Sequence, residues 1–356
     1  MVGTDWDAWF SPRGYSPLWI NQLYLGRSPT IRLNLIQGIE DPRITIPFYI
    51  MVTIAALLTM VGLWSRVSSV VLAIGVISLQ HQTATILHGG DTVLRLLCMY
   101  IALAPSGLSC SLDRVLGLMA GRIKPGPINV SLWSQRLISF NTALLYFTTV
   151  WLKYFGSHWK DGTATWYPAR LNEFHRFPVP PWVNDLPFVK LTTYGTMATE
   201  FLLGTLVFYR PARRYVLLAG VCMHLFIEYS MNIPMFSWLM IGSYLAFYDG
   251  EEVDGWAKRV GARWAKWRTV VTLPRGDALR PEGVAALNAV DPLGLVTYEP
   301  GDAPTFRNTR AAAWRSFGAW PFAWMPGLWK GFLHRSLQTG EEPQPRRKKK
   351  PEMAAP

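Results

Sequence analysis

Two long apolar stretches stand almost side by side near the start of the chain: ITIPFYIMVTIAALLTMVGLW at residues 44–64 and VSSVVLAIGVISLQHQTATIL at residues 67–87. A helix needs about 20 mostly apolar residues to cross the hydrocarbon core of a bilayer, and each stretch is that long. Only Ser65 and Arg66 separate them. We therefore predict two membrane-spanning helices joined by a tight turn.

Five further apolar stretches follow these two. They lie at residues 92–108, 133–156, 188–209, 215–231 and, in a shorter form, 234–248. A helix satisfies its own backbone hydrogen bonds within lipid, so we predict an all-α fold, a polytopic transmembrane bundle of about seven spans. The chain then divides into an N-terminal segment 1–43, a transmembrane domain 44–249 and a tail 250–356.

The composition favours a membrane protein and excludes an ordinary soluble enzyme. Half of the 356 residues are hydrophobic, 16% are charged and the formal net charge is +12, whereas a soluble domain typically carries about 25% charged residues. The three cysteines, Cys98, Cys110 and Cys222, share no close spacing. We therefore expect neither a disulfide framework nor a zinc cluster.

The charges of the connecting loops predict the orientation of the chain in the membrane. Basic connections, at Arg66, 109–132 and 210–214, alternate along the chain with connections of little net charge. Because Lys and Arg concentrate on the inner side, we expect a cytoplasmic tail, with residues 1–43 and 157–187 outside. An outer N-terminal segment without a signal peptide must be carried across. We favour an eighth, preceding helix, missing from this numbering or supplied separately, over a first helix that inserts as a reverse anchor.

The tail combines basic and aromatic residues. Within 254–271, tryptophan and valine recur at helical spacing with basic residues between them, which predicts an amphipathic helix in the inner membrane interface. Residues 311–335 hold a proline-interrupted aromatic cluster, suited to lipid headgroups or to a protein partner. The basic run at 346–350 is expected to bind anionic lipid. Nucleic acid is not an expected partner, since no recognisable nucleic-acid-binding fold surrounds the aromatic residues.

Ionisable side chains inside the apolar stretches carry the functional signal. A charge at membrane depth costs at least about 2.5–3.5 kcal/mol on insertion scales, so each such group needs a partner or a purpose. With the predicted orientation, these groups surround a cavity that opens outward. They are His81, Arg95, Lys153, Glu200, His224 and Glu228.

Two pairs within these stretches have helical spacing. Asp91 and Arg95 stand four residues apart, and we favour a structural ion pair over a ligand-binding role for them. His224 and Glu228 repeat the spacing; a carboxylate that orients an imidazole and a contact that only joins helices are equally good explanations. No third His or Cys follows at a diagnostic distance, so we expect no metal.

Lys153 near the end of the stretch 133–156 admits two interpretations. A lysine at a helix end commonly extends its ammonium toward the membrane surface. Burial, however, favours the neutral amine, which can accept a proton near neutral pH. Aromatic and apolar residues precede Lys153, and Trp159, Asp161 and Gly162 follow it.

Three blocks of sequence resemble one known family. In chain order they are His88-Gly89-Gly90-Asp91 with Leu94-Arg95-Leu96-Leu97, then Trp151-Leu152-Lys153 with Trp159-Lys160-Asp161-Gly162, then His224, followed twelve residues later by Phe236-Ser237 and a Met-containing span. Across about residues 60–249 the blocks are similar to the vitamin K-dependent gamma-carboxylase family. The resemblance is strongest to its bacterial relatives, the horizontally transferred transmembrane (HTTM) domain proteins.

The resemblance implies a chemistry. In the animal enzyme a deprotonated lysine takes a proton from a reduced naphthoquinone, oxygen adds, and the resulting base removes a carbon-bound proton beside a glutamate side chain. By resemblance, Lys153 is the predicted catalytic base, and His224 is the predicted catalytic neighbour that stabilises the quinol or its anion. The predicted cofactor is a reduced, menaquinol-like quinone, bound by His81, Tyr146, Trp159 and Glu228.

The sequence also departs from the family pattern. Gln82-Thr83 stands where bacterial relatives usually carry Arg-Asn, and the short basic tail replaces the large lumenal region with which the animal enzyme recognises its protein substrate. We therefore predict quinol-dependent modification chemistry at the outer face, carboxylase-like (lyase and epoxidase) if the protein is an enzyme, without assigning protein glutamates as the substrate. Two alternatives stay open: a peptide-toxin maturation or export factor, and a non-catalytic membrane scaffold or subunit of a larger complex.

Overall fold

A computed structural model describes most of the chain up to residue 264 and short segments beyond it. The described residues are 17, 19–20, 23, 32–82, 87–126, 128, 130–172, 176–178, 180–264, 269–274, 289, 291, 293 and 296–301. The chain forms two compact units, one of Met1–Ser106 and Asn129–Glu252, the other of Gly107–Ile128 and Val253–Pro356. The predicted division into 1–43, 44–249 and 250–356 concerns membrane placement and stays a prediction.

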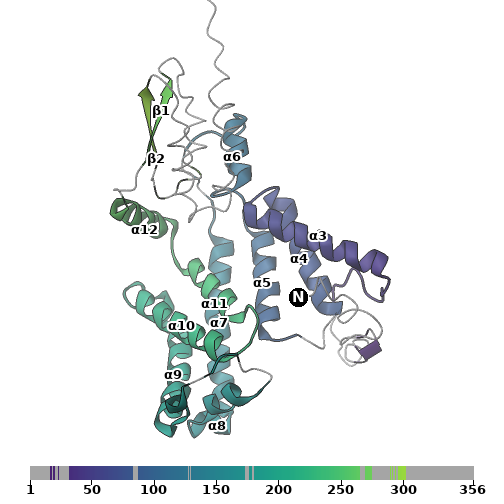
Figure 1. The fold of residues 1–356 in the computed structure, drawn as a ribbon, viewed down its shortest axis with the longest axis vertical. Helices are drawn as coiled ribbons and strands as arrows, with labels where there is room; N and C mark the ends of the chain where they lie inside the picture. Colours follow the sequence, from purple (N-terminus) through teal and green to yellow (C-terminus); the bar gives the residue numbers. More distant parts are fainter. Residues whose placement is uncertain are drawn as a thin grey trace, which may run out of the picture. The chain divides into compact units, whose positions relative to one another are not determined.

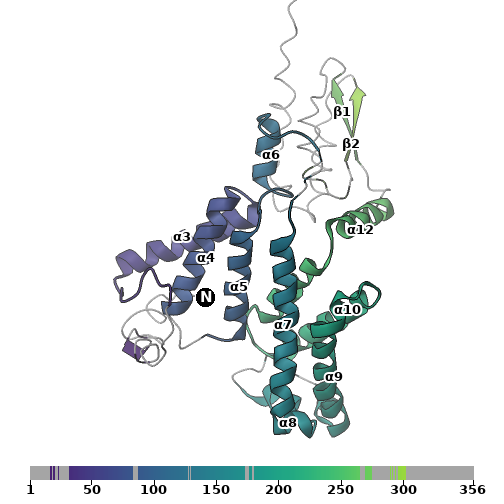
Figure 2. The ribbon, with the colours of Figure 1, turned by 180° about the vertical axis from the view of Figure 1, so that it is seen from behind.

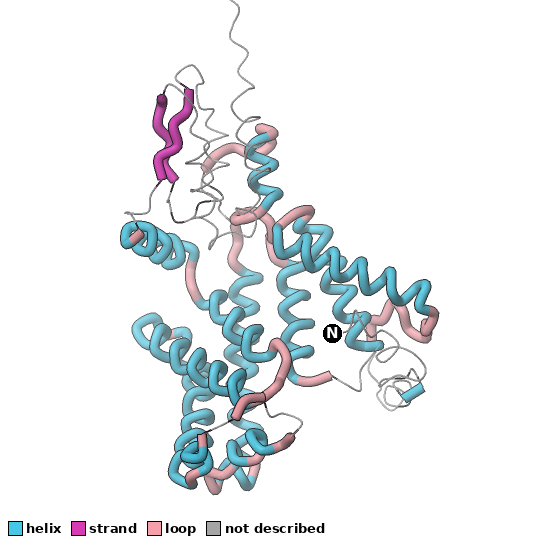
Figure 3. Tube along the Cα trace, in the orientation of Figure 1, coloured by secondary structure: helices cyan, strands magenta, loops and turns pink. Residues whose placement is uncertain are grey.

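The first unit is a bundle of α-helices connected by short 3₁₀ turns (Figures 1 and 3). Its longer helices are α3 Pro42–Val61, α4 Ser65–Gln82, α5 Gly89–Leu103, α7 Trp133–Phe155, α9 Leu186–Thr205, α10 Arg210–Ser230 and α11 Phe236–Ser243. Between them lie α8 Ser157–Lys160, η3 Ala164–Trp166, η4 Pro168–Arg170, η5 Pro181–Asn184, η6 Leu206–Phe208 and η7 Tyr244–Phe247. Each of the seven apolar stretches overlaps one of the longer helices, and the all-α prediction is confirmed for the described residues of this unit.

Local capping explains where the helices begin and end. The His88 side chain accepts a hydrogen bond from the Gly90 backbone N–H, and the His88 backbone N–H donates to Asp91, so α5 starts at Gly89 rather than at residue 92. At the end of α3, Gly62 takes the left-handed conformation (φ 68°) that favours glycine. Met235 (φ 62°) and Pro234 delay the start of α11 to Phe236.

The helices differ in whether they are long and apolar enough to span a membrane. Among the described residues, α3 alone is both long and apolar enough to cross a bilayer, and Phe236–Phe247 is a shorter apolar helical segment. The structure thus places helices at all seven predicted stretches. It leaves the number of membrane crossings a prediction.

Helix α7 lies at the centre of the first unit, where it contacts α5, α9, α11 and η7. Figure 2 shows α7 with α5 on one side and α9 on the other. Helix α11 contacts both α5 and α7, and α10 packs against α9 and α11. At the crossing of α7 and α9, a Cβ on Gly204 would lie 3.0 Å from the N, Cα and Cβ atoms of Phe147. The absent side chain therefore lets the two helices approach closely. The buried hydrophobic core of this unit takes residues from α5, α7, α9, α10, α11 and the turns η6 and η7. It comprises Val93, Ala143, Tyr146, Leu203, Val207, Val216, Leu217, Met240, Tyr244 and Phe247.

The second unit contains α6 Leu112–Met119, most of α12 Gly250–Arg263, and the strands β1 Thr269–Pro274 and β2 Val296–Gly301. The two strands pair in parallel, with Thr269 opposite Val296, and are the departure from an all-helical chain. The predicted helix 254–271 is wrong at both ends. The Asp249 backbone N–H donates to the Glu252 carboxylate, which starts the helix earlier, and residue 271 lies in β1. Residues 311–335 and 346–350 lie outside the described residues.

Candidate active site

Lys153 forms an ion pair with a carboxylate from a neighbouring helix. Its Nζ, in the last turn of α7, donates to Oε1 of Glu200 on α9. Oε2 of Glu200 lies 3.4 Å from the hydroxyl of Thr149, one turn before Lys153. The lysine and glutamate side chains are only 21% and 10% exposed, so the pair is largely shielded from solvent.

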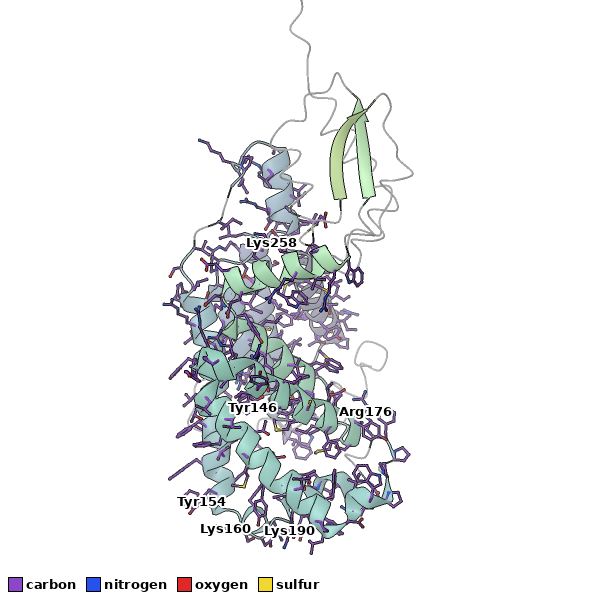
Figure 4. All side chains as sticks on the ribbon, turned by 90° about the vertical axis from the view of Figure 1, so that its left-hand side faces the viewer. Tyr146, Tyr154, Lys160, Arg176, Lys190 and Lys258 are labelled. Atoms are coloured by element: carbon purple, nitrogen blue, oxygen red, sulfur yellow. The ribbon has the colours of Figure 1, made fainter. Side chains whose placement is uncertain are left out.

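Trp159 covers the other side of the lysine. The ring centre of Trp159, on α8, lies 4.7 Å from Nζ of Lys153, within the range of a cation–π contact. The neighbouring Lys160 contacts a different ring, and its ammonium lies 5.7 Å from the ring centre of Tyr154. Figure 4 shows Tyr154 and Lys160 together at one end of the first unit, with Tyr146 further along α7.

A hydrogen-bonded turn follows Trp159 directly after α8. The backbone N–H and hydroxyl of Thr163 both donate to Oδ1 of Asp161, at 2.9 and 2.5 Å. These hydrogen bonds hold the pKa of the Asp161 carboxyl below its usual value. Gly162 between them has φ 79°, a conformation that glycine adopts without strain. Between Lys153 and Trp159, the Gly156 backbone N–H donates to the Lys153 carbonyl oxygen at the end of α7.

A second set of polar side chains lies deeper in the bundle. The Tyr146 hydroxyl is 2.6 Å from Nε2 of His224 on α10 and 2.7 Å from the Tyr244 hydroxyl of η7. The three residues are 2%, 1% and 4% exposed, respectively. The ring of Phe236 lies 5.5 Å from that of His224 in an edge-on contact.

The two sets belong to one site. Tyr146 precedes Lys153 by two turns of α7, and Thr149 lies between them, with its hydroxyl 2.9 Å from the Tyr146 carbonyl oxygen. The charge of Lys153 acts on His224, and that of Glu200 acts on both tyrosines. Four elements, α7, α9, α10 and η7, therefore bring an amine, a carboxylate, an imidazole and two phenols into one electrostatic environment.

Other predicted site residues take part in separate contacts. Nδ1 of His81 lies 2.7 Å from the Leu33 carbonyl oxygen, and Nε2 lies 3.3 Å from a guanidinium nitrogen of Arg95. Asp91 caps α5 through His88, as described above. The structure therefore joins Arg95 to His81, and it shows no ion pair between Asp91 and Arg95. The local cap at His88 outcompetes the helical i,i+4 contact.

Glu228 also pairs outside the predicted site. Its carboxylate and backbone carbonyl accept hydrogen bonds from Arg176. Of the two explanations left open for the spacing of His224 and Glu228, these contacts favour the structural one, in which Glu228 does not orient the imidazole. The next residues reinforce this contact: Phe177 stacks on Tyr229 with 5.6 Å between ring centres, and the Tyr229 hydroxyl donates to the Pro178 carbonyl. Glu228 thus fastens the segment 176–178 to the end of α10.

Sequence reasoning missed two members of the site. Glu200 stood out as an ionisable residue at membrane depth, but nothing in the sequence paired it with Lys153. Tyr244 gave no signal at all, because a tyrosine in an apolar stretch is ordinary. For metals, no group of three or more His, Cys, Asp or Glu side chains with ligand geometry occurs within the described part of the chain.

Comparison with known proteins identifies the family. The model of the HTTM domain matches residues 13–251, about two thirds of the chain. The chain belongs to the HTTM domain family. HTTM is the domain of proteins related to the vitamin K-dependent gamma-carboxylases, so the resemblance inferred from the three sequence blocks is confirmed. Membership makes the chain a membrane protein related to these carboxylases.

One curated relative also matches part of the HTTM chain. The uncharacterized protein YitO of Bacillus subtilis (strain 168) is 30% identical over 116 residues, which are 31% of this chain and 37% of the relative. The match thus spans well under half of the relative's length. No solved structure matches the chain significantly.

Proposed function

We propose that this HTTM protein crosses the membrane about seven times, with residues 157–187 outside and the tail in the cytoplasm. The support is the distribution of side chains, in which large apolar residues are exposed and small polar residues are buried. Large apolar residues on α3, α7, α9 and α10 are exposed, among them Leu57, Phe140, Leu191 and Leu218. Small polar residues are instead buried between helices, as at Ser68, Ser69 and Ser78 of α4. Small residues at helix contacts and apolar residues facing outward are typical of helices in lipid.

We propose further that the site around Lys153 binds a reduced, menaquinol-like quinone and supports quinol-dependent modification chemistry at the outer face. The observation that carries this proposal is the Lys153–Glu200 pair, which sets an amine beside buried phenol and imidazole groups. A reduced quinone, when bound, supplies two electrons and two protons.

The residues around Lys153 fit such a ring. Nδ1 of His224 is buried and has no hydrogen-bond partner among the described residues, and the same holds for the hydroxyl of Ser237 beside Phe236. Unpartnered buried polar atoms call for a ligand or a water. The aromatic rings of Trp159 and Phe236 offer apolar faces to a planar cofactor.

Each residue of the site has a distinct task. Lys153 accepts a proton at Nζ after passing its own proton to Oε1 of Glu200, to which it is already hydrogen-bonded. Thr149 holds the second carboxylate oxygen, and Trp159 keeps water from the amine. His224 supplies a hydrogen-bonding group toward a bound oxygen, oriented by Tyr146.

A single lysine substitution tests the proposed function. We expect Lys153→Met to lower the rate of quinol oxidation by about 10²–10⁴-fold, the usual contribution of a general base. The assay uses protein in lipid nanodiscs, reduced menaquinone and oxygen, and the quinol absorbance reports the rate. Lys160→Met is the matched control, because Lys160 belongs to the same segment and contacts Tyr154.

Two results would contradict the proposal. One is unchanged quinol oxidation in a folded, inserted Lys153→Met variant, which would remove Lys153 from the chemistry. The other is the absence of any quinone binding by the wild-type protein. Extraction of the purified protein with organic solvent, followed by mass spectrometry, shows whether a quinone accompanies it.

We propose that α12 lies in the inner membrane interface and contacts anionic lipid. Trp256 and Val253 are exposed apolar residues on this helix, and a cavity beside Trp256 is lined by Arg259 and Arg263. Basic and aromatic side chains on one short helix suit the headgroup region. The measurement is binding of the purified protein to vesicles with and without phosphatidylglycerol; equal binding of wild type and of Arg259→Gln/Arg263→Gln would contradict the proposal.

A further inference from the structure

Arg95 of α5 carries a positive charge that no carboxylate of the described residues neutralises in an ion pair. Asp91, one turn earlier, is engaged in the cap of α5, where it accepts a hydrogen bond from the His88 backbone N–H and lies 3.5 Å from the His88 ring. Within the described part of the chain, Arg95 makes a single hydrogen bond, at 3.3 Å to Nε2 of His81. A guanidinium has five N–H groups, so most of its donors and its charge remain available to another group.

His81 orients the guanidinium without compensating its charge. An arginine side chain can only donate hydrogen bonds, so Nε2 of His81 accepts and the imidazole proton is on Nδ1. Nδ1 donates this proton to the Leu33 carbonyl oxygen, 2.7 Å away. The imidazole is therefore neutral, and the charge of Arg32 acts on it together with that of Arg95. Arg32 thus adds positive charge near Arg95 rather than balancing it.

The segment that holds His81 is itself fastened to the end of α4, which lies beside α5 (Figures 1 and 2). The Asn34 side-chain amide donates to Oε1 of Gln82 over 2.9 Å, and Nε2 of Gln82 donates to the Ile39 carbonyl oxygen over 3.3 Å. Leu33, whose carbonyl fixes His81, directly precedes Asn34. The direction of the guanidinium is therefore set by a chain of hydrogen bonds before any ligand arrives, as in preorganised binding sites.

Exposed apolar side chains continue along α5 from Arg95. Met99 and Leu103 follow at intervals of four residues, which places all three on one face, about 6 Å apart along the helix. Met99 is 39% exposed and Leu103 is 52% exposed. Because helical side chains lean toward the N-terminus of their helix, Arg95 extends toward Gly89 at the start of α5, away from the apolar strip of Met99 and Leu103.

A phospholipid matches this arrangement of one charge above an apolar strip. A charge at membrane depth is costly without a partner, and two N–H groups of a guanidinium can bind two oxygens of one phosphate. The acyl chain below such a phosphate would meet Met99 and Leu103. Free inorganic phosphate would satisfy the charge and leave the apolar strip unused, so the strip favours the lipid over the free ion.

We infer that Arg95, Met99 and Leu103 form a phospholipid-binding site, with the phosphate on the guanidinium and an acyl chain along α5. His81 is a positioning residue in this site, since it acts through Arg95. The leaflet, the outer one, follows from the proposed topology. Lipid binding itself requires none of the proposed quinol chemistry, so the two can be tested apart.

Native mass spectrometry of protein ejected from nanodiscs counts the lipids that stay bound. The nanodiscs contain digalactosyldiacylglycerol, which has no phosphate, and a minor share of phosphatidylglycerol. Arg95→Gln is the test variant, because its side-chain amide can still donate to His81 while the charge and the paired N–H groups are lost. Arg43→Gln, at an exposed arginine in the first turn of α3, is the control.

We expect the wild type and Arg43→Gln to retain one more phosphatidylglycerol molecule than Arg95→Gln. Equal retention in all three proteins would overturn the inference, even in a protein that oxidises quinol. The expected loss supports it, even in a protein that oxidises none. Millimolar inorganic phosphate should not displace the retained lipid; displacement would mean that the site takes the free ion and would overturn the assignment to a lipid.

Photo-crosslinking tests the site in the wild type, should Arg95→Gln fail to fold. Trace phosphatidylglycerol with a photoreactive acyl chain should label Met99 or Leu103 more strongly than exposed apolar residues elsewhere, such as Phe140 and Leu191. The digalactosyl lipid with the same photoreactive chain lacks the phosphate and should show no such preference. Uniform labelling of these positions by the phospholipid would overturn the inference.

Discussion

Lys153 and Glu200 form an ion pair between α7 and α9, although forty-seven positions separate them in the sequence. Both side chains are largely buried, and the charge of each is compensated by the other. The pair therefore links the stability of the bundle to its proposed chemistry. A change that removes one charge leaves the other buried without compensation.

Removal of one partner should destabilise the protein more than removal of both. Breaking a buried ion pair from one side typically costs about 3–5 kcal/mol, whereas replacement of both partners by apolar groups is often nearly neutral. We expect Glu200→Leu to lower the thermal unfolding midpoint in detergent, and Lys153→Met/Glu200→Leu to recover most of the loss.

The exposed pair of Lys258 and Asp254 is the control. Its side chains are 76% and 61% exposed, and surface pairs contribute about 0–1 kcal/mol. Asp254→Ala should hardly change the unfolding midpoint. If Glu200→Leu behaved like Asp254→Ala, the pair would not contribute to stability as described.

A Cβ at Gly220 of α10 would lie 2.5 Å from the hydroxyl oxygen of Tyr244, so a methyl group there should disturb the hydrogen bond between Tyr244 and Tyr146 without changing any polar residue. We expect Gly220→Ala to cost about 1–3 kcal/mol, as overpacked cores do, and to slow quinol oxidation because the Tyr244 hydroxyl moves. Gly195→Ala in α9 is the matched control, since nothing lies within 4 Å of its added Cβ. That variant should be as stable as the wild type or slightly more stable. Equal unfolding midpoints for the two variants would contradict the predicted clash.

Loss of Arg176 should loosen the C-terminal end of α10. Arg176 donates to both the backbone carbonyl and the carboxylate of Glu228. The second carboxylate oxygen of Glu228 is buried and has no hydrogen-bond partner in the part of the chain that the structure describes. We expect Arg176→Gln to cost about 1–2 kcal/mol and to speed amide exchange near Tyr229. Arg43→Gln, at an exposed arginine in the first turn of α3, should leave exchange at Tyr229 unchanged. Exchange that is equally slow in both variants would show that Arg176 does not hold α10.

Cysteine labelling tests the proposed topology. In a protein whose native cysteines are replaced by serine or alanine, Asn172→Cys lies in the outer loop and Gly255→Cys in the tail. A membrane-impermeant maleimide added to intact cells should label the first and not the second. Labelling of both from outside, or of the second alone, would contradict the proposed orientation. Permeabilised cells, in which both should react, serve as the control.

The helices could be predicted from the sequence because each apolar stretch carries its own signal. Boundaries depended on local caps, and the sequence missed the start of α5 at Gly89 and the end of α12 at Arg263. The strands β1 and β2 were not predicted from the sequence, because tryptophan and valine within 254–271 recur at a spacing typical of one continuous helix. In each case a short-range hydrogen bond or a strand partner prevailed over the apolar pattern.

The site could be predicted only in part, because its contacts join distant positions. Contacts and charges link Lys153 to Trp159 and to the buried pair of Tyr146 and His224, and the roles of these residues stay predictions. His81 and Glu228 have other partners, Leu33 and Arg176, which no spacing along a single helix could reveal. Spacing predicts neighbours on one helix, whereas Glu200 and Tyr244 meet their partners through the packing of separate helices.

The close crossing at Gly204 has a consequence for relatives of this chain. Lys153 meets Glu200 because α7 and α9 approach each other where Gly204 faces the backbone of Phe147. A larger residue at this position would separate the two helices while every reactive group remained in the sequence. A relative that keeps Lys153, Glu200 and His224 can therefore still lack the ion pair between Lys153 and Glu200, and its polar residues alone would not reveal the loss.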